Sequence, residues 1–424
     1  MGSSAVRRAR IIAENEGEDR VSGLPDEQSV SKKRFRGCVV EKFIQYAISR
    51  NVQELHICFG INFKHKPYKL STFSSKFLEK LTLGMQLEES PLESDIWVLP
   101  ALTTLHLKCS YTYGVNYKLH ESWLTSLPAL RTLTLDFWDL SETSFSLPNL
   151  TTLELFYCKL PRIVWNLPAL LTLHLGTSDI PKNMSELFSA LVNLQNLTLN
   201  IWEEESMKRE YFISCPQLLN LDIWTQCYAP PANIVVSAPQ LRNFSSFGIF
   251  AIKFGVPELE NVNIKLKDWF NYAGPLDTKK YYQRFTCMLS GLGTAKNLSF
   301  DLESIEALSE ISGFLASISS PFYNLKYVKL PEDHKESNMS TALRSYLLGG
   351  SPRATIVTSL PQKNRILQAP VPVVAENAGH EPLASPAEEL ELRALRMEIL
   401  TEIQNDMGTN LAAGFIGDDL LSGL

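Results

Sequence analysis

Three histidines share a sequence context that would direct them to one face of a sheet. His56, His106 and His174 each stand between two aliphatic residues, so in an extended strand the imidazoles face away from the apolar side. Imidazole nitrogens are frequent zinc ligands, which makes a metal site the first chemistry to consider. On separate parallel strands the nearest two would be roughly 10 Å apart, with one strand between them. One ion with ligand bonds of about 2 Å cannot span that distance, so we expect neither a metal nor a cofactor.

The local motifs of common catalytic sites are missing from the sequence. There is no G-x-x-x-x-G-K-[ST] or G-x-G-x-x-G phosphate loop, no G-x-S-x-G nucleophile turn and no H-E-x-x-H zinc helix. On this basis we expect a scaffold that binds a partner and not an enzyme.

A leucine pattern that recurs along most of the chain is the framework on which these residues lie. It is clearest as (L/V)-P-x-L-x-x-L-x-L at residues 99–107, 127–135, 147–155 and 167–175. Looser copies extend it from Val52 to Leu259, about 18 to 28 residues apart, and most of these steps fall within the range of about 20–29 residues of leucine-rich repeats. Two weaker copies begin at Ala295 and Leu325 after longer steps. The break in spacing predicts a differently built C-terminal cap.

The pattern of one repeat explains why the repeats must stack. Leu153 and Leu155 alternate with Thr152 and Glu154, so the leucines share one face of a short strand. One strand cannot bury that face alone, and parallel stacking would bury a continuous leucine column. We therefore predict an α/β fold, a leucine-rich-repeat solenoid with a parallel concave sheet, a helical N-terminal cap and a C-terminal α+β cap. A doubly wound α/β domain would need a long amphipathic helix between strands, and residues 156–168 are too short for one.

The concave face is the expected binding surface, because polar and aromatic residues alternate with the leucines. Large aromatic side chains at one edge of neighbouring strands are candidate hot spots for an unknown protein target. The alternative is that these rings pack under the following loops. The candidate residues are Asp136, Trp138, Glu154, Phe156, His174, Asn200, Trp202, Asp222 and Trp224.

Composition and charge restrict the partner and the compartment. The 424 residues are 45% hydrophobic, and 40 Lys and Arg against 46 Asp and Glu give a net charge of −6, so we expect no nucleic-acid partner. No apolar run reaches about 18 residues, so we expect no membrane span. The seven cysteines form no C-x-x-C pair, and the N-terminus has no signal-peptide apolar region. We therefore expect a cytoplasmic or nuclear location, or both.

Changes in composition divide the chain into five zones. The spacing of Val40, Phe43, Ile44 and Ala47 predicts an amphipathic helix that caps the leucine column. Beyond the repeats, one helix is expected around residues 305–318. The zones are a flexible N-terminus (1–37), the leucine-rich repeats (38–270), the C-terminal cap (271–359), a linker (360–384) and a tail with one helix (385–424).

The tail helix is predicted from its capping box. Ser385 and Glu388 frame a proline at the first helical position, and an apolar stripe from Leu392 to Ile403 follows. The stripe could pack on a partner helix, or the helix could be a loosely ordered tail.

Three landmarks around the repeats resemble one family. The N-terminal segment 19–27 (Asp-Arg-Val-Ser-Gly-Leu-Pro-Asp-Glu) resembles the opening of the F-box in plant F-box proteins with leucine-rich repeats and an FBD-type C-terminal region. Residues 43–55 resemble the entry to that family's repeats, and residues 346–356 (Tyr-Leu-Leu-Gly-Gly-Ser-Pro-Arg-Ala-Thr-Ile) resemble its closing motif. The resemblance covers most of the chain and makes residues 271–359 an FBD-like region.

The resemblance implies a substrate receptor of an SCF-type ubiquitin ligase, in which the F-box docks a Skp-type adaptor and the repeats select the target. Only Leu24 and Pro25 of the docking surface are present, because the polar segment 28–36 replaces the remaining F-box helices. We therefore expect a truncated F-box and weak or absent adaptor binding. The alternative is a free leucine-rich interaction module, or a non-functional splice or pseudogene product, with no link to ubiquitination.

Overall fold

The computed structural model describes residues 8–13, 44–59, 74–85, 97–109, 117–119, 124–143, 146–160, 165–177, 184–201, 210–225, 233–255, 258–266, 278–332 and 339–358. These residues form two compact units, the first up to Leu150 and the second from Thr151 onward. Both are built on parallel strands, so the predicted α/β repeat fold is confirmed. The linker, the tail helix, the F-box-like segment and Trp202 lie outside the described residues.

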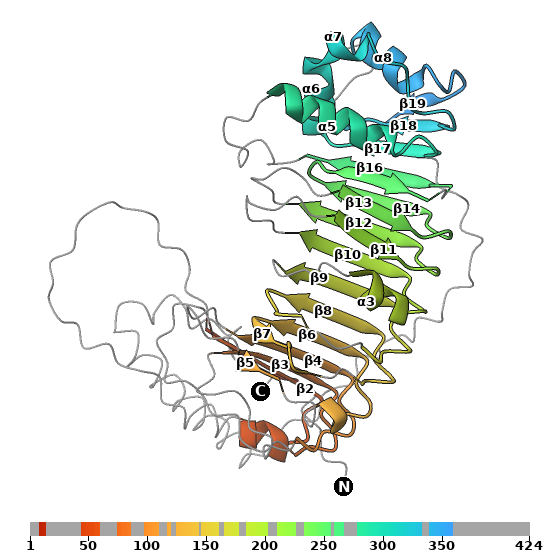
Figure 1. Ribbon diagram of the computed structural model, residues 1–424. Helices are drawn as coiled ribbons and strands as arrows, with labels where there is room; N and C mark the ends of the chain where they lie inside the picture. The colour runs from red at the N-terminus through yellow and green to blue at the C-terminus, as the bar shows by residue number, and fades with distance from the viewer. Residues whose placement is uncertain are drawn as a thin grey trace, which may run out of the picture. The chain divides into compact units, whose positions relative to one another are not determined.

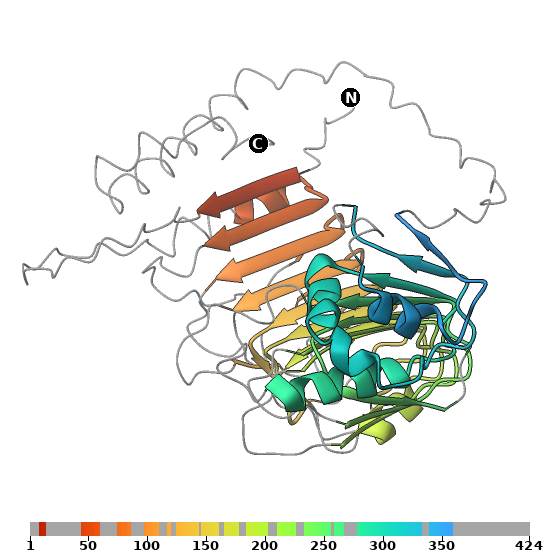
Figure 2. The ribbon, with the colours of Figure 1, turned by 90° about the horizontal axis from the view of Figure 1, so that it is seen from above.

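The first unit contains five parallel strands that pair in chain order (Figure 2). They are β1 (Arg8–Ala13), β2 (Glu54–Phe59), β3 (Lys80–Met85), β4 (Thr104–Cys109) and β6 (Thr132–Asp136). A separate two-stranded sheet joins β5 (Tyr117–Lys118) to β7 (Trp138–Asp139).

The second unit continues the same construction with nine parallel strands in one sheet. In pairing order they are β8 (Thr152–Phe156), β9 (Thr172–Thr177), β10 (Asn196–Ile201), β12 (Asn220–Thr225), β14 (Asn243–Phe247), β16 (Asn261–Lys265), β17 (Asn297–Phe300), β18 (Tyr327–Lys329) and β19 (Thr355–Val357). The longer steps before β17 and β18 therefore do not end the sheet, which keeps its register beyond the expected boundary at residue 270.

A second parallel sheet in this unit was not predicted from the sequence. It consists of β11 (Glu210–Ser214), β13 (Asn233–Ser237) and β15 (Ala251–Phe254). This sheet contacts the main sheet: the buried ring of Phe244 on β14 lies edge-on to the half-buried ring of Phe254 on β15, with centroids 5.3 Å apart. The core of this part of the unit thus lies between two sheets.

The leucine column is buried as the repeat pattern predicts. Leu105 and Leu133 in the first unit, and Leu153, Leu173 and Leu197 in the second, are almost completely inaccessible to solvent. Burying one such side chain stabilises the fold by about 1.5–3 kcal/mol relative to exposing it. Since every repeat contributes at least one buried position of this kind, apolar burial is the main stabilising term of both units.

A row of asparagines runs across the main sheet of the second unit. The strands β10, β12, β14, β16 and β17 all start with asparagine, and each side-chain amide donates to the residue on the preceding strand. Asn196 donates to the Thr172 hydroxyl at 3.1 Å, and Asn220 donates to the Asn196 oxygen at 2.5 Å. The same bond recurs from Asn243 to Asn220, Asn261 to Asn243 and Asn297 to Asn261. This asparagine ladder fixes the register of the strands at their starting ends.

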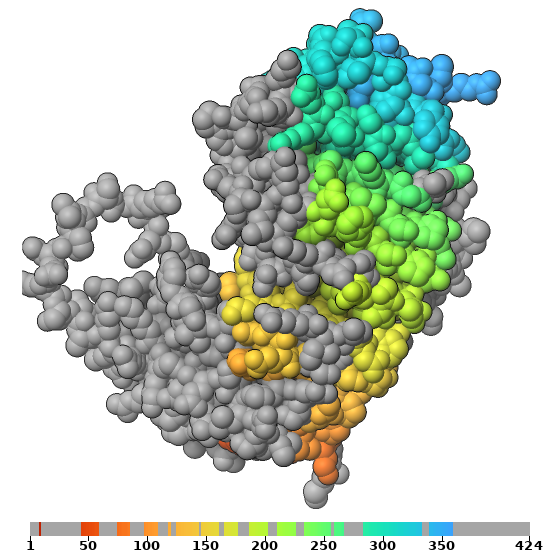
Figure 3. Space-filling model, in the orientation of Figure 1, coloured from red at the N-terminus to blue at the C-terminus, as the bar shows by residue number. Residues whose placement is uncertain are grey.

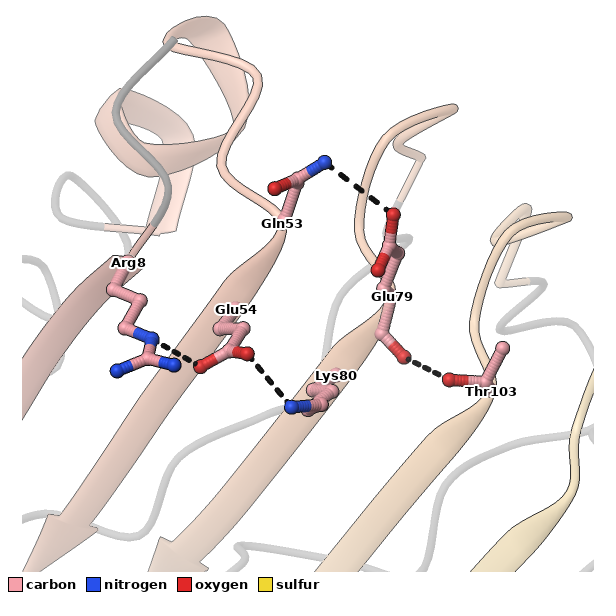
Figure 4. A network of polar contacts seen from close by, with 6 residues as sticks. All are labelled: Arg8, Gln53, Glu54, Glu79, Lys80 and Thr103. Atoms are coloured by element: carbon pink, nitrogen blue, oxygen red, sulfur yellow. Dashed lines mark hydrogen bonds and ion pairs between the residues drawn. The ribbon is translucent and has the colours of Figure 1, made fainter. Parts of the chain in front are cut away.

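The N-terminal zone, expected to be flexible, contributes the strand β1. Its residues pair in parallel with β2, and Ala9 is buried beside Leu55. Glu54 accepts ion pairs from Arg8 and from Lys80, each at 2.7 Å, so it links three strands (Figure 4). The hydrogen bond from Lys80 and the charge of Arg8 lower the pKa of Glu54. Composition did not reveal this strand, because its six residues carry no leucine pattern and are embedded in a polar stretch.

The predicted N-terminal helix is confirmed at residues 44–49, with Ile44 and Ala47 buried, whereas Val40 and Phe43 of the predicted stripe lie outside the described residues. The edge of β2, however, is covered by β1 and not left to the helix alone. A short helix, α3 (Met184–Ala190), packs beside β11 in the second unit.

The C-terminal cap contains more helix than the sequence predicted. Figure 1 shows α5 (Thr278–Ser290), α6 (Leu302–Glu310), α7 (Ser312–Leu315) and α8 (Thr341–Leu348) gathered around the last strands of the main sheet. In the space-filling view, the teal and blue atoms belong to this C-terminal part of the chain (Figure 3). The one helix expected at residues 305–318 corresponds to α6 and α7, which divide at Ile311. Asp301 caps α6 by accepting from the Ser304 N–H at 2.9 Å, and it also accepts from the Leu266 N–H at 2.8 Å. One carboxylate thus attaches this helix to the chain that leaves β16.

Leu153→Ala is expected to lower the free energy of unfolding by about 2–5 kcal/mol, because it leaves a cavity in the leucine column. Leu171→Ala is the matched control, since Leu171 is 38% exposed next to the same strands and should change stability much less. Denaturant unfolding of both variants measures the difference. Equal unfolding midpoints for the two would contradict the stacked-leucine core.

Candidate functional site

Most of the candidate binding residues of the second unit lie on the face of its main sheet opposite the leucine column. In β8, β10 and β12 buried residues alternate with half-buried or exposed ones. Parallel pairing sets Glu154, His174, Thr198, Asp222 and Ser245 side by side in one row. A second row, two residues further along each strand, contains Phe156, Gly176, Asn200, Trp224 and Phe247.

These two rows bring together most of the candidate residues of the second unit. We name as the polar-aromatic strip the residues Glu154, Phe156, His174, Asn200, Asp222, Trp224 and Phe247.

Aromatic contacts hold both ends of the strip. The rings of Phe156 and His174 meet edge-on with centroids 4.7 Å apart. Trp224 and Phe247 are stacked with centroids 5.1 Å apart and planes inclined by 19°. Trp224 keeps 42% of its surface exposed, so Phe247 supports the indole without covering it.

Glycine at position 176 makes room for the ring of Phe156. A Cβ atom at Gly176 would lie 3.0 Å from Cδ1 of Phe156, which is closer than packed carbon atoms normally approach. Gly176 itself is buried. The neighbouring strand therefore provides the space over which Phe156 lies, and a larger residue there would displace the ring.

Partial burial determines the charge of the strip. Loss of hydration lowers the pKa of His174, and the carboxylates of Glu154 and Asp222 oppose that shift, so the imidazole is neutral at pH 7. Loss of hydration also raises the pKa of Asp222, against a hydrogen bond from Ser245 and the charges of Lys265 and His174. In both residues, partial burial thus disfavours the charged form of the side chain.

The side-chain oxygen of Asn200 is an unsatisfied acceptor in the same strip. It is buried and accepts no hydrogen bond from the residues that the structure describes. By register Asn200 lies between Gly176 and Trp224. Buried polar atoms usually have a partner, so this oxygen marks a place where a hydrogen-bond donor would be stabilised.

The prediction that Trp138 lies on the exposed face is wrong. Its side chain is completely buried, and its indole N–H donates to the Leu107 carbonyl oxygen at 3.2 Å. Phe137 explains the difference, since its φ of 62° is in the left-handed region and breaks the alternation of the strand. Trp138 consequently belongs to β7 of the small sheet and packs in the core.

Asp136, the remaining candidate of the first unit, is half-buried at the end of β6. Loss of hydration raises its pKa, against the charge of Lys108. One carboxylate oxygen is buried and accepts no hydrogen bond from the described residues. Asp136 belongs to the first unit and is not a member of the polar-aromatic strip, which lies in the second unit.

The sequence analysis missed Phe247, which belongs to the strip, and Ser245, which lies beside Asp222 in the first row. Both follow Leu241, the start of the next repeat, at the same offsets that Trp224 and Asp222 have from Leu218. Extending the alternation by one more repeat would have found them.

The three histidines occupy the outward positions that their sequence context predicts. His56 and His106 are half-buried on β2 and β4, and Thr82 stands between them in the register. Among the described residues, no group of three or more histidines, cysteines or carboxylates could hold a metal ion. The described helices also include none that is long and apolar enough to cross a membrane.

Fold and strip together define a parallel-sheet repeat protein with a polar, aromatic face. Compared with models of known protein families, the sequence matches none, and no curated protein is similar to it. The resemblance to plant F-box proteins therefore stays a prediction.

Asp222→Asn is expected to lower the pKa of His174 further, because it removes a negative charge that favours the imidazolium. Burial already lowers this pKa below the value of about 6.5 that is usual in an unfolded chain. Below that pH the unfolded chain therefore binds more protons at His174 than the folded chain does, so the stability of the fold decreases as the pH falls. NMR titration of the His174 ring measures the shift. Glu210→Gln on β11 is the control, and a higher pKa in Asp222→Asn would contradict this description of the strip.

Proposed function

We propose that this chain is a protein-binding leucine-rich-repeat module, and that the polar-aromatic strip is its recognition surface. The observation that carries the proposal is the stacked but exposed Trp224 beside the half-buried carboxylate of Asp222. Tryptophan is one of the residue types enriched at the energetic centres of protein interfaces. The sheet holds Trp224 and Phe247 rigidly, because their strands β12 and β14 are each paired with another strand on both sides.

Charge favours a protein partner over nucleic acid. The strip carries the carboxylates of Glu154 and Asp222, and the chain as a whole has a net charge of −6. Phosphate backbones bind to clusters of lysine and arginine. At the positions that neighbour the strip, the register places the single residue Lys265 beside Phe247, and one lysine is not a cluster. We accordingly propose a role in binding and not in catalysis.

The wider role that we propose is that of a substrate receptor of an SCF-type ubiquitin ligase, in the cytoplasm or nucleus. Three motifs in family order support it: the F-box-like segment 19–27, the repeat entry at 43–55 and the closing motif at 346–356. The alternative is a free interaction module without a link to ubiquitination. The truncated F-box-like segment, with Leu24 and Pro25 as its remaining docking residues, favours that alternative.

The double variant Phe156→Ala/Trp224→Ala should weaken binding of the partner by roughly 2 kcal/mol or more, about thirtyfold in affinity. Partners are first isolated by cross-linking to the unaltered chain, and their affinities are then compared. Phe212→Ala is the matched control, because Phe212 is 46% exposed on β11 of the other sheet. A folded double variant that binds the same partners with unchanged affinity would overturn the assignment of the strip.

The chain is expected to bind a Skp-type adaptor weakly or not at all. Stable protein interfaces bury near 800 Å² per partner, and the segment 28–37 is too polar and basic to supply an apolar core of that size. Co-purification compares the chain with a version in which a complete F-box follows Glu27. Capture of an equal amount of adaptor by the unaltered chain would show that its docking surface lies elsewhere.

A further inference from the structure

Asp222 is a half-buried carboxylate on the polar face of β12. Burial raises its pKa, and Ser245 supplies a hydrogen bond to it. In the part of the chain that the structure describes, no lysine or arginine forms an ion pair with it. Lys265 acts on Asp222 only through its charge. A carboxylate that has lost hydration without gaining a cation is stabilised strongly when a cationic donor arrives.

Trp224 offers an aromatic surface next to this carboxylate. The two residues are alternate members of β12 and face the same side of the sheet, so their Cα atoms are about 6.6 Å apart. Phe247 stacks against the indole from the β14 side. On the opposite side the register places the shorter Asn200 and then Gly176. The indole is therefore supported on one side and has small neighbours on the other.

Asn200 adds an acceptor to the same location. Its buried side-chain oxygen accepts no hydrogen bond from the described residues, and Asn200 is the direct register partner of Trp224. The surroundings of the indole thus combine a carboxylate with an unsatisfied amide oxygen. Both groups accept hydrogen bonds, and both favour a ligand that is rich in donors.

We propose that Asp222 and Trp224 form a subsite for an arginine side chain of the protein partner, an inference that rests on the proposed binding function. A guanidinium group is planar, so it stacks on an indole while its N–H groups reach a carboxylate. Five donors also suit a site with several acceptors. A lysine ammonium is compact and strongly hydrated, and it satisfies the carboxylate without stacking. Lys265, near the far side of Phe247, disfavours a second cation there and directs the guanidinium to the Asn200 side.

The test uses the full-length chain labelled with ¹⁵N, and it follows the indole N–H signals by NMR. Trp224→Phe identifies the signal of Trp224 among those of the seven tryptophans. The probe is N-acetyl-arginine amide, and the neutral isostere N-acetyl-citrulline amide is its matched control. We expect saturable shifts of the Trp224 signal with the arginine probe and much smaller ones with citrulline. Asp222→Asn should weaken arginine binding about tenfold, the loss expected for a charge-assisted hydrogen bond, whereas Glu210→Gln should leave it unchanged.

Two outcomes would overturn the inference. One is the absence of a Trp224 shift with the arginine probe, and the other is an equal response to citrulline, which would indicate stacking without recognition of charge. If Asp222→Asn also moves the signals of the buried tryptophans, and is therefore misfolded, the comparison of the two probes on the unaltered chain still decides. Failure of the arginine probe together with loss of partner binding in Phe156→Ala/Trp224→Ala would reject the subsite and retain the binding function. Unchanged partner binding in that variant would reject the function itself.

Discussion

Hydrogen bonding between parallel strands, kept in register from β8 to β19, is the constraint on which the rest of the second unit depends. In-register pairing sets equivalent residues of successive repeats side by side, so a sequence repeat becomes a row of like side chains. The leucines form the buried column, the asparagines form the ladder, and the residues between them form the polar-aromatic strip. The regularity of each row of side chains depends on the regularity of the backbone pairing between the strands. Because the backbone fixes the strands, the exposed rings of the strip are held in place without needing an ordered loop.

Much of this arrangement could be predicted from the sequence, because two short-range rules generate it. The spacing of leucines locates each strand, and the alternation within a strand decides which side chains are buried. Leu153 and Leu173 are buried on these grounds, while Glu154 and His174 face the other way. The same rules hold for the weaker copies at Ala295 and Leu325, which lie two residues before β17 and β18, and these strands pair in the common register. Their wide spacing suggested an end to the repeats, but the added residues form α5 and α6 between strands and do not disturb the pairing.

What the sequence did not reveal depends on departures from these rules or on neighbours distant in the chain. Phe137 adopts a left-handed conformation, and this single residue turns Trp138 from the exposed face into the core. The strands β11, β13 and β15 carry no leucine signature, so the second sheet became visible only in the fold. The electrostatics of the strip are likewise a property of packing, since the hydration lost by His174 and Asp222 depends on the strands beside them. Side-chain types alone could nominate these residues, but they could not give the direction in which each pKa moves.

The asparagine ladder has a consequence for how such a chain can change its length. Every amide in it donates to the strand before, and every one except the last, Asn297, accepts from the strand after. Each ladder residue is therefore chemically complementary to its own kind. Any repeat that starts with asparagine can therefore follow any other without new side-chain partners. Duplication or loss of a whole repeat between β10 and β17 would leave a continuous ladder, whereas a partial repeat would interrupt it. The second unit is thus suited to gain or lose strands in steps of one whole repeat. Such a step would change the number of strands beside the polar-aromatic strip and leave the residues of the strip unchanged.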